Sequence, residues 1–148
     1  MWQIRTLGDP VLRKICDPVT EETFFMSSVW SLFDEMALLM TQCHGVGLAA
    51  NQIGVSRRFF IYDYKDKINL IINPEIVAHS SKLVYMKEGC LSVVDQAVEV
   101  PRWEWVVIGG QDYYGEDIEC RATGFMARIF QHEIDHLDGK LIIDYKES

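Results

Sequence analysis

Two histidines four positions apart near the end of the chain have the clearest chemical pattern. His132, Glu133 and His136 belong to an HExxH sequence. Residues four apart on a helix lie one turn above each other, so both imidazoles can bind the same metal ion. Glu133 is rotated by about 100° from His132 and can accept a proton from water activated by the metal. The pattern predicts a metal-dependent hydrolase in which Glu133 handles the proton.

The HExxH sequence alone leaves the class of protein open. Two histidines on a helix can also be solvated surface residues. Metallopeptidases of the zincin type use the same pair and take a third ligand downstream, but residues 137–148 contain no histidine. A structural metal module without catalysis would have all four metal positions filled by protein. A third ligand is therefore expected upstream of the helix.

Two upstream segments combine glycine with polar residues. Residues 45–52 read GVGLAANQ, and residues 88–92 read EGCLS. Gly45 can simply end the preceding helix, so the first segment is weak evidence by itself. The second places the thiol of Cys90 beside a glycine in an extended segment. The other cysteines are expected to be small buried hydrophobic side chains, namely Cys16, Cys43 and Cys120.

Capping signals predict three helices that would position these segments. Asp9-Pro10 predicts a short helix through Lys14. A longer helix is expected after Thr20, and a C-terminal helix from Thr123 or Gly124 to Asp138, ended by Gly139. The long helix has a stripe of apolar residues at three- or four-residue steps, typical of a buried face. The stripe comprises Phe25, Val29, Leu32, Met36, Leu39 and Met40.

Between the helices, the chain has strand signals. The expected strands are residues 59–64, 70–72, 75–78, 98–108 and 118–120. Pro74 restricts pairing between the second and third of these, and Gly115 indicates a hairpin turn before the last. Helices at both ends and strands between them predict an α+β fold. In that fold, antiparallel sheets surround the central metal-binding helix.

The composition favours one domain, comprising residues 1–148. The chain has 14 Lys and Arg against 22 Asp and Glu, a formal net charge of -8. This balance argues against direct nucleic-acid binding. No apolar run is long enough for a signal peptide or a transmembrane helix. A cytoplasmic protein with reduced thiols is expected.

Taken together, the segments resemble the peptide deformylase family. GVGLAANQ, EGCLS and QHEIDHLDG occur in the order and spacing of that family's three motifs. The resemblance extends over nearly the whole chain and includes residues 10–13, 72–74 and 100–102. It implies hydrolysis of the N-terminal formyl group of nascent polypeptides that begin with formyl-methionine, with release of formate.

The resemblance also implies a role for particular residues. Cys90, His132 and His136 would be the metal ligands, with water in the fourth position. The native ion of the family is usually Fe²⁺, while Zn²⁺ or Ni²⁺ can occupy the site, and the sequence does not choose between them. The oxyanion of the intermediate would be stabilised by the Gln52 side chain and the Leu91 backbone N–H.

The resemblance further implies a substrate site. The backbone of Val46 and Gly47 would bind the substrate chain in an extended form, and glycine at positions 45 and 47 permits close approach. Phe125 and Ile129 precede His132 by seven and three residues, on the metal-facing side of the helix. They are expected to line the methionine pocket with Val46, although each can equally be ordinary core.

Arg128 departs from the apolar residue usual at its place in the family. It is either an exposed helix residue or a residue at the pocket rim that contacts the substrate. In the second case Arg128→Ala would raise KM on short formyl-peptides. A further hypothesis concerns Asp135 in the HExxH helix, since a carboxylate there faces away from the ion. We expect it to form an ion pair with Arg102, anchoring the helix to the strand near Cys90.

Other departures from the family limit what carries over. Val94 and Ala97 stand where many members have proline and then arginine, so the resemblance implies no substrate contacts on that side. His44 stands where glutamate or proline often occurs. The chain stops soon after Tyr145 and so resembles short, phage-encoded deformylases, leaving a phage origin as one alternative. Contact with the ribosome is a further expectation that the acidic sequence does not favour.

Overall fold

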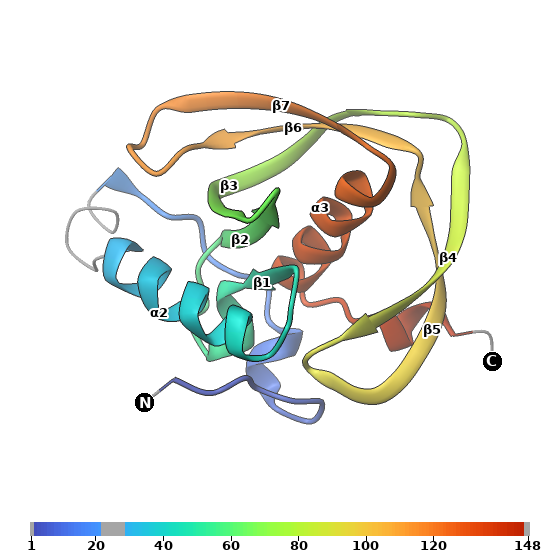
Figure 1. The fold of residues 1–148 in the computed structure, drawn as a ribbon, viewed down its shortest axis with the longest axis horizontal. Helices are drawn as coiled ribbons and strands as arrows, with labels where there is room; N and C mark the ends of the chain where they lie inside the picture. The colour runs from blue at the N-terminus through green and yellow to red at the C-terminus, as the bar shows by residue number, and fades with distance from the viewer. Residues whose placement is uncertain (1, 22–28, 147–148) are drawn as a thin grey trace.

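Antiparallel strands around a central helix make up most of the computed structural model. The structure describes residues 2–21 and 29–146. Figure 1 shows the helix α3 near the middle of the molecule, between strands β1 to β3 and the β4–β5 hairpin. The strands are β1 Gly47–Ala49, β2 Phe59–Tyr64, β3 Lys67–His79, β4 Leu83–Cys90, β5 Val93–Trp103, β6 Trp105–Gln111 and β7 Asp117–Thr123. The α-helices described are α2 Val29–Gln42 and α3 Gly124–Leu137, and the short 3-10 helices are η1 Pro10–Arg13, η2 Ala50–Ile53 and η3 Ile142–Tyr145.

The strands form two separate sheets. The larger has the order β1-β2-β3-β6-β7, and β4 and β5 form the smaller. All named neighbours pair antiparallel. The α+β prediction with antiparallel sheets around the helix is therefore confirmed.

One face of α3 packs against the larger sheet. Phe130 and Ile134 are buried in a cluster with Phe60 of β2 and Ile108 of β6. Buried residues of α3 at steps of three and four complete this face, since such residues share one side of a helix. They are Ala127, Phe130, Ile134 and Leu137. The opposite side of α3 is therefore turned towards β4 and β5.

Both ends of α3 agree with the predicted bounds within a residue or two. Gly139 has φ +76, a left-handed conformation that favours glycine. A Cβ on Gly139 would also lie 2.6 Å from the backbone oxygen of Arg13. The predicted short helix after Asp9 is the 3-10 turn η1, whose Val11 N–H donates to the Asp9 side chain. The capping signals at Asp9 and Gly139 therefore predicted the start of η1 and the end of α3 correctly.

The long N-terminal helix is confirmed over the part that the structure describes. Met36 and Met40 are buried in a cluster with Leu48 and Ile53. The helix was expected to begin after Thr20. Residues 22–28, which include Phe25, lie outside the described part of the chain. Within residues 2–21 and 29–146, no helix is long and apolar enough to cross a membrane.

Strand β3 runs on through the proline that was expected to interrupt it. Its pairing with β6 shifts register between Ile72 and Glu75, and Asn73 adopts φ +51. A bulge accommodates proline because the missing N–H falls where the ladder is already broken. Asn73 also pairs with the backbone of Val19, donating from Nδ2 and accepting at Oδ1, each at 2.8 Å.

Candidate metal centre

The three predicted ligands lie together although they come from two different elements. Cys90 ends β4, whereas His132 and His136 project from α3, and their donor atoms all lie within 4.8 Å of one another. Nε2 of His136 is 3.3 Å from Sγ of Cys90 and 3.2 Å from Nε2 of His132. Metal bonds of about 2.0–2.3 Å in a tetrahedral site place donors roughly 3.3–3.6 Å apart. The cluster therefore fits one metal ion.

The two histidines have different surroundings. Burial lowers the pKa of His136, so its imidazole is neutral, the form that binds a metal. Burial would lower the pKa of His132 too, but hydrogen bonds to Cys90 and Glu88 outweigh it and raise this pKa to about 10. Nδ1 of His132 lies 2.8 Å from Oε1 of Glu88. When Nδ1 donates its proton in a hydrogen bond to the Glu88 carboxylate, Nε2 is the nitrogen that faces the metal site.

Glu88 is the centre of a buried polar network that sequence reasoning missed. Arg102 donates from Nε to Oε2 and from Nη2 to Oε1, each at 2.9 Å. Burial raises the pKa of the Glu88 carboxyl, but hydrogen bonds from His132 and Arg102 outweigh it and lower this pKa to about 2. Strand alternation alone does not place Glu88 beside the thiol, because the pairing of β4 with β5 shifts register between Glu88 and Cys90. Both residues nevertheless line the same cavity.

The predicted ion pair between Asp135 and Arg102 is confirmed, at 2.5 Å between Oδ2 and Nη1. The same carboxylate accepts a hydrogen bond from Oη of Tyr145 at 2.6 Å. Arg102 therefore connects Asp135 on α3 to Glu88 on β4. No local pattern in the sequence indicated the part played by Tyr145.

Glu133 is buried beside the ligand cluster, with only 4% of its surface exposed. Burial raises the pKa of its carboxyl to about 7, although His132 and Arg102 nearby act to lower it. Its Oε1 has no hydrogen-bond partner among the described residues. A carboxyl group that changes protonation near neutral pH suits proton transfer.

Gln52 is held with its amide group next to Cys90. Its Oε1 accepts from the Ala49 N–H at 2.9 Å, and its Nε2 donates to Oγ of Ser92 at 3.0 Å. These contacts fix the side-chain NH₂ towards the cluster, and Nε2 lies 3.8 Å from Sγ of Cys90. Its predicted role as oxyanion donor, like that of the Leu91 N–H, stays a prediction.

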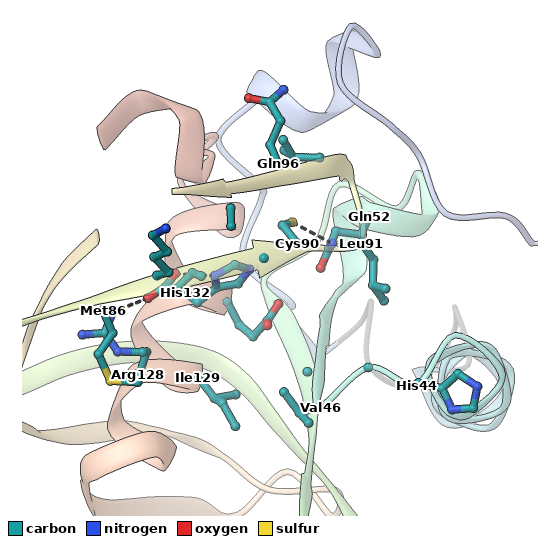
Figure 2. Close-up of a pocket in the computed structure, with 18 of the residues that line it drawn as sticks. His44, Val46, Gln52, Met86, Cys90, Leu91, Gln96, Arg128, Ile129 and His132 are labelled. Carbon is teal, nitrogen blue, oxygen red and sulfur yellow. Dashed lines mark hydrogen bonds and ion pairs between the residues drawn. The ribbon is translucent and has the colours of Figure 1, made fainter. Parts of the chain in front are cut away.

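A cavity of about 650 Å³ opens next to the cluster. Figure 2 shows side chains from β4, β5, α3 and the β1 region around it, with Val46 and Ile129 on one side and Gln96 on the other. Every residue predicted for substrate binding lines it: Gly45, Val46, Gly47, Phe125, Arg128 and Ile129. The lining also includes residues that were not predicted, namely His44, Met86, Lys87, Asp95, Gln96 and Ala97.

Arg128 is placed differently from either expectation. An exposed helix position is wrong, because only 6% of the residue is exposed. Its guanidinium is also not a free group at the pocket rim. Nη1 donates to Oε2 of Glu88 at 2.6 Å and to the Val100 carbonyl at 2.9 Å, and Nη2 donates to the Val84 carbonyl at 2.6 Å. Whether it also touches the substrate stays a prediction.

A neutral imidazole, a second imidazole with a carboxylate behind it, and a thiol can together hold one ion and leave a position for water. With Glu133 beside them and a cavity in front, the site is of the mononuclear metallohydrolase class. Comparison with known proteins then identifies the family.

The family model that matches residues 1–148 is polypeptide deformylase. A peptide deformylase of Halothermothrix orenii is 49% identical over 144 residues, covering 96% of this chain and 91% of the relative. The crystal structure of the Thermotoga maritima peptide deformylase has a TM-score of 0.93 at 41% identity, covering 100% of this chain and 99% of that one. A Met-Ala-Ser-bound class I type b enzyme from Acinetobacter baumannii has a TM-score of 0.92 at 34% identity, covering 99% and 98%.

The chain therefore belongs to the polypeptide deformylase family and is an enzyme of that family. The resemblance seen in the three motifs is confirmed over the full length of the chain. The zincin and structural-module interpretations of the HExxH sequence are excluded by the same finding.

Proposed function

We propose that this chain hydrolyses the N-terminal formyl group of polypeptides beginning with formyl-methionine and releases formate. One observation carries the proposal. The donor atoms of Cys90, His132 and His136 converge within 4.8 Å, and Cys90 and His132 line the same cavity as Glu133. Family membership supplies the reaction, and this geometry supplies the groups that it needs.

One divalent metal ion bound by Cys90, His132 and His136 would polarise the formyl oxygen and activate water. A thiolate with two imidazoles suits Fe²⁺, Zn²⁺ and Ni²⁺. We propose Fe²⁺ as the native ion, with Zn²⁺ or Ni²⁺ in some purified samples. Metal analysis of protein purified without oxygen tests this choice, and zinc at full occupancy in such a sample would contradict it.

Glu133 moves the proton in this scheme. Its carboxylate takes a proton from the attacking water and gives it to the amine that leaves. The NH₂ group of Gln52, oriented by Ala49 and Ser92, donates to the formyl oxygen as negative charge develops there, together with the Leu91 N–H. The Gln52 amide is held by these two hydrogen bonds before the reaction begins, so it needs little reorganisation.

The cavity suits an extended peptide that starts with methionine. β1 is an edge strand of the larger sheet, so the backbone around Val46 and Gly47 can pair with a further strand. Val46, Phe125 and Ile129 supply apolar side chains for the methionine pocket. The Met-Ala-Ser-bound relative supports a peptide of this kind.

Formate release from formyl-Met-Ala by the iron-loaded, oxygen-protected enzyme tests the function. We expect Glu133→Gln to lower kcat by roughly 10²–10⁴-fold, the usual contribution of a general base, while the metal content stays unchanged. No formate from the metal-loaded wild type would contradict the proposal. Equal rates in wild type and Glu133→Gln would overturn the role of the carboxylate.

We also place the enzyme in the cytoplasm, acting on nascent chains close to the ribosome. The formal net charge of -8 makes direct binding to ribosomal RNA unfavourable. Ribosome co-sedimentation at low salt tests this setting. A phage origin of the gene stays an alternative on which the site has no bearing.

A further inference from the structure

The ligand set depends on how the β4–β5 hairpin sits against α3. Cys90 belongs to the two-stranded sheet, whereas His132 and His136 belong to α3. These two elements share no sheet hydrogen bonds, so side chains must hold them in place. Figure 2 shows that Arg128 and His132 project from α3 towards β4.

Arg128 connects α3 to both strands of the hairpin. Its guanidinium binds β4 through the Glu88 carboxylate and the Val84 carbonyl, and β5 through the Val100 carbonyl. The side chain is 7% exposed, and that of Glu88 is 6% exposed. Other ties are the Arg102–Asp135 pair and the pair of hydrogen bonds between Gln131 and the Trp103 backbone.

Arg128 also acts on a metal ligand through one intermediate. Glu88 accepts from Arg128 at Oε2 and is paired with Nδ1 of His132 at Oε1. A carboxylate behind a metal-bound histidine fixes the ring and its tautomer. Without Arg128, Oε2 of Glu88 would keep only the bond from Nε of Arg102, and the buried Val100 carbonyl and the half-buried Val84 carbonyl would each lose this hydrogen bond.

We propose that Arg128 is a positioning residue of the metal centre, holding Glu88 against His132 and the Cys90 hairpin against α3. Three of its N–H groups are engaged by Glu88 and two carbonyls, so its main role is within the protein and not towards the substrate. Arg128 also lines the cavity. This inference depends on the proposed function only for its kinetic readout.

Two variants test the proposal, Arg128→Met and Arg128→Lys. The first keeps most of the bulk and removes every donor, and the second keeps the charge with a single donor group. Arg58→Met is the matched control, because Arg58 anchors the other end of α3 through the Leu137 carbonyl and Asp138. Arg58 does not contact Glu88 or a metal ligand among the described residues.

The main readouts are the visible spectrum of the Co²⁺-loaded protein and the rate of metal loss to excess chelator. We expect Arg128→Met to lose metal about 10–100-fold faster, as for other groups behind a metal-bound histidine, with a changed spectrum. Arg128→Lys should recover part of this loss, and Arg58→Met should match the wild type in both. With metal saturating, kcat should fall in Arg128→Met while KM stays within a factor of two or so.

Wild-type spectrum and metal retention in Arg128→Met would overturn the proposal, and a raised KM with them would make Arg128 a substrate contact. The same metal loss in Arg58→Met would also overturn it, since any loosening of α3 would then suffice. If Arg128→Met does not fold, Arg128→Lys decides, because wild-type metal retention in that variant contradicts the proposal. Failure of the wild type to release formate would sink the proposed function without altering the metal readouts.

Discussion

At the scale of single residues, the carboxylate of Glu133 occupies space that glycine at position 47 leaves open. A Cβ on Gly47 would lie 2.5 Å from Oε2 of Glu133 and 3.1 Å from Cγ2 of Ile129. From the sequence, the expected role of this glycine is to let the substrate approach the backbone closely. The structure adds a second reason, because any larger residue would push the carboxylate out of place.

We therefore expect Gly47→Ala to lower kcat for formate release by roughly 100-fold, the usual cost of displacing a reacting group by about 1 Å. Gly45→Ala is the control, since its Cβ would approach Cδ1 of Leu91 at 3.0 Å and Cγ of Met40 at 3.3 Å. Both are atoms of flexible side chains that can move, so the loss should be much smaller. Equal kcat values for the two variants would contradict this account of Gly47.

The metal-binding and proton-transfer residues that sequence reasoning found are those with a local pattern. His132, Glu133 and His136 follow helix spacing, and Cys90 stands within a recognisable motif. Arg128 was placed wrongly because its partners Val84 and Glu88 lie more than thirty positions away. Which distant acceptors meet a given guanidinium depends on how the sheet packs on the helix, and no spacing rule records it.

At the scale of elements, β2 was predictable, whereas β4 of the hairpin was not. The single strand expected at residues 98–108 is wrong, because it is divided between β5 and β6, which belong to different sheets. β2 was expected at residues 59–64 and is found there. In β4, the residues before Glu88 are all exposed or half-buried, so Leu83–Lys87 lack the alternation that marks a strand. This hairpin carries Cys90, so one ligand depends on an element that hydrophobic pattern alone does not reveal.

The hairpin and α3 are also held by η3 through Tyr145. Its hydroxyl donates to Asp135 at 2.6 Å, and its ring lies under the Arg102 guanidinium, 5.1 Å from Cζ to the ring centroid. We expect Tyr145→Phe to lower the free energy of unfolding by about 1.5–3 kcal/mol, the range for a hydrogen bond to a charged group. Urea denaturation measures this difference.

Tyr114→Phe is the matched control for Tyr145→Phe, because Tyr114 is 78% exposed and loses the same hydroxyl. It should unfold within about 0.5 kcal/mol of the wild type. If Tyr145→Phe were equally neutral, η3 would not stabilise the hairpin through this hydroxyl.

At the scale of the whole molecule, both ends of the described chain cover the smaller sheet. Leu12 of η1 and Ile142 of η3 are buried in one cluster with Val93 and Val100 of β5. The ion pair between Arg13 and Asp144, at 2.7 Å, joins η1 to η3. The element that carries Cys90 is thus fixed by residues from opposite ends of the sequence.

This end-to-end ion pair should give the stability a measurable dependence on pH. The hydrogen bond from Arg13 lowers the pKa of Asp144 below its usual 3.8. A carboxyl whose pKa is lower in the folded state stabilises the protein above its unfolded pKa, and loses that contribution as the pH falls through the folded pKa. The contribution should therefore be present at neutral pH and disappear in acid.

We expect Asp144→Asn to be less stable than the wild type by up to about 1 kcal/mol at pH 7, since both side chains are partly exposed and water screens the pair. Urea denaturation between pH 7 and roughly pH 3 should show this difference shrinking towards zero as Asp144 becomes protonated. Asp17→Asn removes the same charge from the Arg57 pair, where the Asp17 side chain is 73% exposed, and should change stability little at either pH. A deficit in Asp144→Asn that stays constant over the range would show that packing of η3 holds the two ends together, with no contribution from the carboxylate's charge.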